Sequence, residues 1–198
     1  MNFTAQNKKE NGFTIIEIII AIFILCIGII GVYSAFSAVS ILTSDSADRL
    51  VAAYLSQEGI EIIRNIRDAN WLLCFGSLCY WTDHLTDCAA GCEVDYKNSP
   101  IGVYSSGGTH GLIIQWANNG RYLETDSDGF YRYLTNENPT KFKRKVSIIL
   151  LGNYAMRVVS EVSWDKRASI LGGALKAGEG DCNPLNCVKT EDVLYDWF

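Results

Sequence analysis

Residues 12–45 read GFTIIEIIIAIFILCIGIIGVYSAFSAVSILTSD, and this stretch decides the fold of the 198-residue chain. Between Glu17 and Asp45 lie 27 consecutive residues without a charge, more than the roughly 20 apolar residues that a helix needs to cross a bilayer. Lys8 and Lys9 precede the stretch, so we expect the residues before it to stay in the cytoplasm and the C-terminal mass to be exported. The pattern therefore predicts one membrane-spanning helix.

Two ordinary interpretations of this helix compete, and Glu17 weighs against one of them. A secretory signal would be cut near Ala35-Phe36-Ser37, but its apolar core usually spans only about 7–15 residues, fewer than here. A plain signal anchor gives no reason for Glu17, because a charge inside a membrane helix costs about 2.5–3.5 kcal/mol on insertion scales. An intramembrane carboxylate indicates a functional residue that needs a partner.

The segment around the start of the helix resembles a known signal. Lys8 and Lys9 followed by Gly12-Phe13-Thr14-Ile15-Ile16-Glu17 resemble the class III signal of type IV pilins and type II secretion pseudopilins. The resemblance covers residues 8–45 closely and the rest only in architecture. It implies that a prepilin peptidase cuts after Gly12 and methylates the new N-terminal Phe13, and that Glu17 pairs with this amine. Many family members carry a proline midway along the helix, whereas the first proline here is Pro100.

The function that the resemblance implies is that of a structural filament subunit rather than an enzyme. Such a subunit forms a polymer with its own kind or with other pilin-type subunits. It spans the inner membrane once through residues 13–44 before assembly, and later lies in an extracellular pilus or an envelope-spanning pseudopilus. Physically, a buried amine and carboxylate offset each other's desolvation only when they pair, and a repeated head-to-tail contact builds a helical filament. The alternative is a membrane-anchored or secreted disulfide-rich binding module that does not polymerise.

The helix is predicted to continue beyond the membrane segment, from about Phe13 to about Asn70. Over residues 46–71 the apolar side chains keep a 3.6-residue period, which is typical of an amphipathic helix packed on a domain. The predicted apolar face contains Ala47, Leu50, Val51, Tyr54, Leu55, Ile62, Ile63 and Ile66. The predicted polar face contains Asp48, Arg49, Gln57, Glu58, Glu61, Arg64 and Arg67. The organisation is therefore a leader (1–12), a membrane and assembly helix (13–44), its amphipathic continuation (45–71) and a head (72–198).

The head is predicted to be an antiparallel sheet, which makes the fold class α+β. Residues 72–110 indicate a loop-rich excursion, and short alternating runs separated by turns follow it. The expected strands are Gly111–Trp116, Arg121–Glu124, Phe130–Leu134, Lys145–Leu151, Met156–Trp164 and Val193–Phe198. We expect this sheet to pack against the amphipathic half of the helix.

The cysteines of the head indicate disulfides and an oxidising compartment. Six of the seven lie beyond residue 70 in three close pairs, whereas Cys26 lies in the membrane segment and is expected to be unpaired. The expected disulfides are Cys74–Cys79, Cys88–Cys92 and Cys182–Cys187, and a longer link to the C-terminal pair is the rival. A zinc site would favour C-x2-C spacing with histidine partners, which this sequence lacks.

One acidic turn imitates the opening of a calcium loop. Glu124, Asp126 and Asp128 alternate before Gly129, but Thr135 occupies the twelfth position, where such a loop closes with an acidic residue. Acidic turns between strands are common, so a plain hairpin turn is the favoured interpretation and calcium is the alternative.

Other functions find little support in the sequence. The net charge of −5 argues against nucleic acid, which needs a basic face. His84 and His110 lie in loop regions without a nucleophile motif, so no catalytic site is predicted. The many aromatic residues of the head are assigned to the sheet and core, and an adhesive surface for carbohydrate is the alternative.

Overall fold

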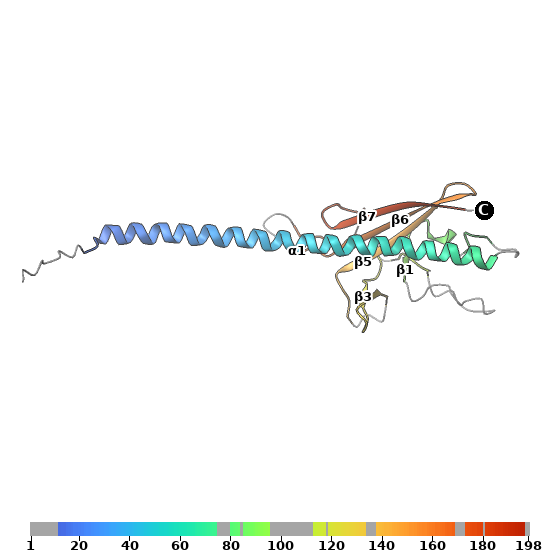
Figure 1. Cartoon of the computed structure of the whole chain (residues 1–198), viewed down its shortest axis with the longest axis horizontal. Coiled ribbons are helices and arrows are strands. Elements are labelled where there is room, and N and C mark those ends of the chain that lie inside the picture. Colours follow the sequence, from blue (N-terminus) through green and yellow to red (C-terminus); the bar gives the residue numbers. More distant parts are fainter. Residues whose placement is uncertain are drawn as a thin grey trace, which may run out of the picture. The chain divides into compact units, whose positions relative to one another are not determined.

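The computed structural model describes residues 12–74, 80–83, 85–95, 113–117, 119–133, 138–168, 173–179 and 181–196. The chain divides into two units, Met1–Ser44 and Asp45–Phe198. Helix α1 (Ile15–Cys74) is 60 residues long and runs through both units (Figure 1).

The first unit consists, in its described part, of the apolar half of α1. Its side chains are almost all exposed, including Phe23 at 65% and Ile30 at 66%. The span Ile15–Leu72 contains an 18-residue window with a mean hydropathy of 3.1, none of which is buried within the protein. Length and composition thus allow this helix to cross a membrane.

The second unit contains a five-stranded antiparallel sheet with the order β2-β1-β5-β6-β7 and a separate two-stranded sheet of β3 and β4. The long pairings join β5 to β6, with Val146 opposite Ser160, and β6 to β7, with Ser160 opposite Thr190. A short 3-10 helix, η1 (Thr86–Cys88), precedes β1. The strands are β1 (Cys92–Val94), β2 (Ile113–Gln115), β3 (Glu124–Thr125), β4 (Tyr131–Arg132), β5 (Phe142–Leu150), β6 (Ala155–Trp164) and β7 (Cys187–Tyr195).

The second half of α1 packs directly on the sheet. The Ser56 hydroxyl donates a hydrogen bond of 2.8 Å to the Ser160 carbonyl, and both residues are fully buried. Gly59 lies at the closest approach, because a Cβ added there would be 2.5 Å from the Ser160 Oγ atom. Residue 160 belongs to an otherwise apolar inward row of β6, so a small side chain is needed where the helix backbone comes near.

The core forms around this contact in two clusters of buried side chains. The larger contains Ile63 and Ile66 of α1 with Val146, Met156 and Val158 of the sheet. The smaller contains Leu55, Leu123, Phe142 and Trp164, and Trp164 is completely buried. The predicted α+β fold, with the helix packed on an antiparallel sheet, is confirmed.

A buried arginine ties the helix to two strands of the sheet. Arg144 of β5 has no exposed surface, and its guanidinium donates to the carbonyls of Leu55 at 3.2 Å and Val94 at 2.6 Å. The same group lies 3.3 Å from the Glu58 carboxylate, which is partly exposed. Because an unpaired buried charge is costly, these three partners make Arg144 a fixed link between α1, β1 and β5.

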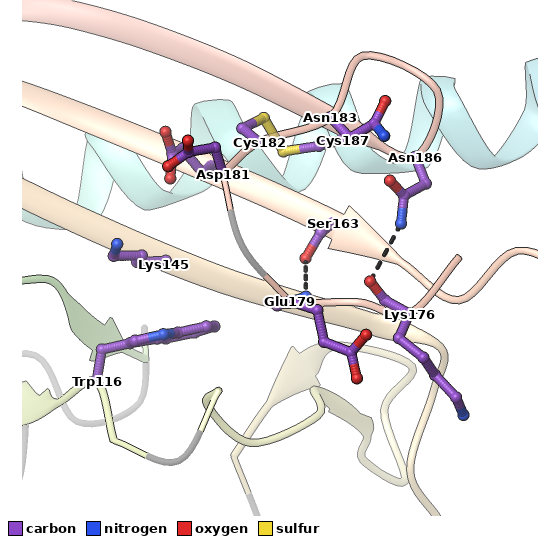
Figure 2. Close-up of a pocket in the computed structure, with 12 residues that line it drawn as sticks. Trp116, Lys145, Ser163, Lys176, Glu179, Asp181, Cys182, Asn183, Asn186 and Cys187 are labelled. Atoms are coloured by element: carbon purple, nitrogen blue, oxygen red, sulfur yellow. Dashed lines mark hydrogen bonds between the residues drawn. A yellow bond between two sulfur atoms is a disulfide. The ribbon is translucent and has the colours of Figure 1, made fainter. Parts of the chain in front are cut away.

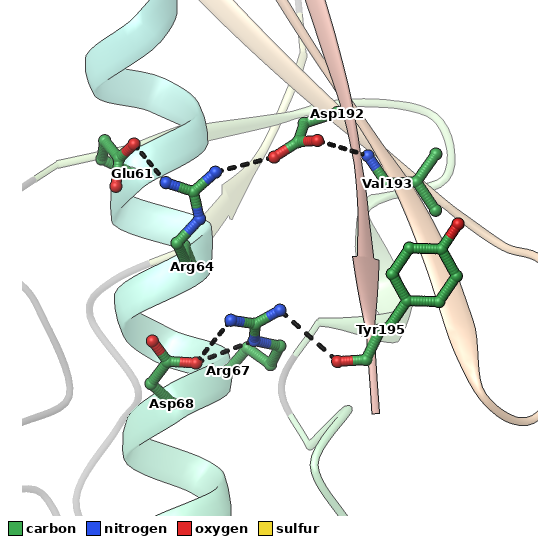
Figure 3. Close-up of polar contacts among 7 residues, drawn as sticks. All are labelled: Glu61, Arg64, Arg67, Asp68, Asp192, Val193 and Tyr195. Carbon is green, nitrogen blue, oxygen red and sulfur yellow. Dashed lines mark hydrogen bonds and ion pairs between the residues drawn. The ribbon is translucent and has the colours of Figure 1, made fainter. Parts of the chain in front are cut away.

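The predicted faces of the helix are wrong at four positions. Ala47 was expected on the apolar face but is exposed. Leu50 and Tyr54 were expected on the same face but are 58% and 66% exposed. Each lies two residues from Ala52, which is fully buried, and two residues turn a helix by about 200°. Arg67 was placed on the polar face but is 3% exposed, because its guanidinium reaches the Tyr195 carbonyl at the end of β7 (Figure 3).

Several predicted strand limits also differ from the structure. The last strand begins at Cys187 rather than at residue 193, because residues 187–192, most of them polar, pair with residues 158–163 of β6. Strand β1 was missed inside the loop-rich region, where three buried residues are too few to show a period. The run 121–124 enters a strand only at Glu124, and α1 extends beyond the predicted end to Cys74.

Candidate functional site

The first turn of α1 is built by a capping arrangement on Thr14. The Thr14 hydroxyl accepts a hydrogen bond of 3.4 Å from the Glu17 amide, and the Thr14 carbonyl accepts one of 3.3 Å from the Ile18 amide. A threonine followed three residues later by a glutamate is the capping-box pattern, which stabilises a helix start by about 1 kcal/mol. Sequence analysis did not assign this role to Thr14, although T-x-x-E at residues 14–17 is its signal.

The expected cleavage point lies just before this cap. Gly12 and Phe13 are outside the helix and exposed, and the Phe13 side chain is 79% exposed. A peptide bond in such a segment can enter a peptidase site without unwinding a helix. Removal of residues 1–12 would leave Thr14 and its hydrogen bonds to the helix in place.

Glu17 occupies the first turn of the helix, where its carboxylate interacts favourably with the helix dipole. Within the described residues its carboxylate has no ion-pair partner, and the surrounding side chains Ile16, Ile18 and Ile20 are all at least half exposed. Cleavage after Gly12 would place a new cationic amine on Phe13, four residues before Glu17. The Glu17 carboxylate could pair with such an amine, including that of another copy of the chain.

The described cysteines of the head pair as proximity along the chain predicts. Cys88 is bonded to Cys92, across the turn between η1 and β1, and Cys182 is bonded to Cys187 at the start of β7. Cys26 is free and exposed on the apolar half of α1. The expected Cys74–Cys79 bond lies outside the described residues, because Cys79 is not among them.

The acidic turn of residues 124–129 connects β3 and β4 as a hairpin. One Asp126 carboxylate oxygen accepts hydrogen bonds of 3.0 Å from the amides of Asp128 and Phe130. Glu124 is 1% exposed and faces away from the turn toward the Asn138 amide. No group of three or more potential metal ligands occurs among the described residues, so calcium binding here stays a prediction without structural support.

An ion pair and a hydrogen bond attach α1 to β7 (Figure 3). The Arg64 guanidinium donates to Asp192 at 2.7 Å and also bonds Glu61. The hydrogen bond to Asp192 is the main cause that raises the pKa of Arg64. These contacts position the helix, and nothing in their geometry indicates chemistry. The predicted loop histidines, His84 and His110, lie outside the described residues.

Comparison with known proteins identifies the N-terminal segment. Residues 7–33 match the model of the prokaryotic N-terminal methylation motif. This motif is the class III signal of type IV pilins and pseudopilins, and it includes Gly12, Phe13, Thr14 and Glu17. No curated protein and no solved structure matches the chain. The chain thus carries a pilin-type precursor signal on a membrane-capable helix.

Proposed function

We propose that this protein is a structural subunit of a type IV pilus-like or pseudopilus filament. The observation that supports the proposal best is the methylation motif at residues 7–33, at the start of α1, where an 18-residue apolar window has no surface buried within the protein. Fully burying a large aliphatic side chain is worth about 1.5–3 kcal/mol. The exposed side chains of residues 13–44 therefore need lipid before assembly and neighbouring helices afterwards.

In this proposal a prepilin peptidase cuts after Gly12 and methylates the Phe13 amine. The amine of an incoming subunit then pairs with Glu17 of a neighbour, which sets the stagger of the two helices. Before assembly the protein spans the inner membrane once with its head exported, where the Cys88–Cys92 and Cys182–Cys187 disulfides are stable. The partners are further copies or other pilin-type subunits, and the chain has no catalytic role.

The test is the substitution Glu17→Val. Loss of one partner of a buried ion pair costs about 3–5 kcal/mol, which corresponds to a roughly 150- to 5,000-fold weakening of each subunit contact. We expect normal membrane insertion and cleavage but few or no filaments in sheared fractions viewed by electron microscopy. Glu17→Gln keeps the size of the side chain and removes the charge, so it should resemble Glu17→Val if the charge matters.

Ile18→Val in the same turn is the matched control, and it should assemble like the natural chain. Normal filaments from cleaved Glu17→Val protein would refute the pairing role. If the natural chain itself forms no filaments in cells with an active assembly machinery, the alternative holds. The protein would then be a membrane-anchored binding module that does not polymerise.

A further inference from the structure

The outer face of the sheet carries a pocket that the filament proposal does not use. Side chains alternate along β5 and β6, so Lys145, Glu161 and Ser163 lie on the face opposite to Val146 and Ser160, which pack on α1. These three residues line the pocket from the strands. The other lining residues come from residues 176–179, from residues 181–187 and from Trp116 (Figure 2).

One wall of the pocket is held rigidly by hydrogen bonds and a disulfide. The Gly178 amide donates 2.8 Å to the Ser163 hydroxyl. The Asn186 side chain is almost fully buried and donates to the carbonyls of Trp164 at 3.0 Å and Lys176 at 3.3 Å. The Cys182–Cys187 disulfide links residues of the same wall (Figure 2). A wall fixed in this way is pre-formed, as is usual for ligand sites.

The opposite wall is the indole of Trp116. Its amide donates 2.9 Å to the Gly91 carbonyl, which anchors the residue to the sheet. The ring lies over Gly120, because a Cβ added there would be 2.3 Å from two ring atoms. Gly120 also has a φ of 69°, which favours glycine. The half-buried ring therefore has a fixed position and presents part of its apolar surface to the pocket.

The charged groups of the pocket carry both signs: Lys145 lies directly opposite Glu161 in the sheet, and Lys176 pairs with Asp165 at 3.8 Å. Lys145, Glu161, Glu179 and Asp181 have no hydrogen-bond or ion-pair partner among the described residues. They do not gather into a set of three metal ligands within the described chain. A single anion would need clustered cations and a metal ion would need clustered carboxylates, so this pattern fits neither.

We propose that this pocket binds a neutral saccharide, through one sugar ring of a glycan. A pyranose has an apolar face of C–H groups that packs on an indole, and a rim of hydroxyls that both donate and accept. The acceptors are the carboxylates of Glu161, Glu179 and Asp181, and the donor is the Lys145 ammonium. Hydrogen bonds to charged groups are the stronger ones, and these four groups line the pocket together with the Trp116 ring. The pocket opens to solvent, so a longer glycan can extend from it.

The experiment measures binding to the full-length protein in a detergent whose headgroup is not a sugar, so that the micelle does not compete. The probes are glucose, galactose, mannose, N-acetylglucosamine and their neutral disaccharides. Their binding is measured by saturation-transfer NMR and tryptophan fluorescence. We expect saturable binding of at least one probe. Trp116→Ala and Asp181→Asn should each weaken it about tenfold or more.

Glu191→Gln is the matched control, because Glu191 is an exposed carboxylate on the same face of the sheet, at β7, outside the pocket lining. It should leave binding within about twofold of the natural chain. Asp181 is exposed, so Asp181→Asn tests the site even if Trp116→Ala perturbs folding. No saturable binding by any probe, or binding unchanged in both pocket variants, overturns the proposal. Preferential binding of inorganic phosphate at these residues overturns the ligand class. Because unpolymerised protein is used, the result is independent of filament formation.

Discussion

Replacing Gly59 with alanine tests how closely the helix must approach the sheet. The added Cβ would lie 2.5 Å from the Ser160 Oγ atom and 3.2 Å from carbon atoms of Arg144 and Val146. Two effects oppose each other. Alanine favours the helix by about 1 kcal/mol over glycine, whereas overpacking a core costs about 1–3 kcal/mol. Because three neighbours are crowded at once, we expect a net loss of about 1–2 kcal/mol in the free energy of unfolding.

A second substitution isolates the contact. The Ser160 hydroxyl is buried and has no hydrogen-bond partner among the described residues, so Ser160→Ala should change the free energy of unfolding by less than about 1 kcal/mol. It also removes the atom nearest to the new methyl group. In the Ser160→Ala background, the cost of Gly59→Ala should therefore fall by about 1 kcal/mol, a coupling that a double-mutant cycle can resolve.

The assay is urea unfolding of the full-length chain in detergent micelles, followed by fluorescence, to which the fully buried Trp164 contributes. Gly28→Ala is the control in the same helix, since a Cβ at Gly28 meets nothing within 4 Å. It should leave the unfolding of the head unchanged. If Gly59→Ala instead stabilises the head by about 1 kcal/mol, or if the two substitutions are simply additive, the argument from close packing is wrong.

The mature chain should begin at Phe13 with one added methyl group, which intact mass spectrometry can measure. Gly12→Arg should leave the precursor uncut. A natural chain that retains residues 1–12 would contradict this prediction. Burial and then the hydrogen bonds to Asp165 raise the pKa of Tyr122 from 10.0 to about 12, so the folded head holds this proton more tightly than the unfolded chain. The resulting stabilisation is complete below pH 10 and is lost as the pH rises toward 12. Tyr122→Phe should therefore reduce this decline in the free energy of unfolding, measured by urea unfolding. A decline that Tyr122→Phe leaves unchanged would exclude this group as its cause. Calcium should leave the unfolding midpoint of the head unchanged, because amides already occupy one Asp126 oxygen; a calcium-dependent shift that Asp128→Asn removes would instead support the predicted calcium site.

Properties that depend on neighbours along the chain could be predicted from the sequence. The long apolar run is a local feature, and so are the spacing of Gly12, Phe13 and Glu17 and the alternation of β6. Short-range disulfides such as Cys88–Cys92 also follow from proximity. Even so, the cap on Thr14 was missed, although its signal was local.

Properties that depend on which elements meet were decided by the tertiary structure alone. An apolar period cannot show that Ala52, rather than Leu50 or Tyr54, faces the sheet, since all three suit a packed face. It cannot show that Arg67 is buried, because its partner, the Tyr195 carbonyl, is 128 residues away. Residues 187–192, most of them polar, join β7 because β6 offers them a ladder of backbone hydrogen bonds, which no side-chain pattern of their own reveals. The pocket beside Trp116 arises in the same way, from segments that only folding brings together.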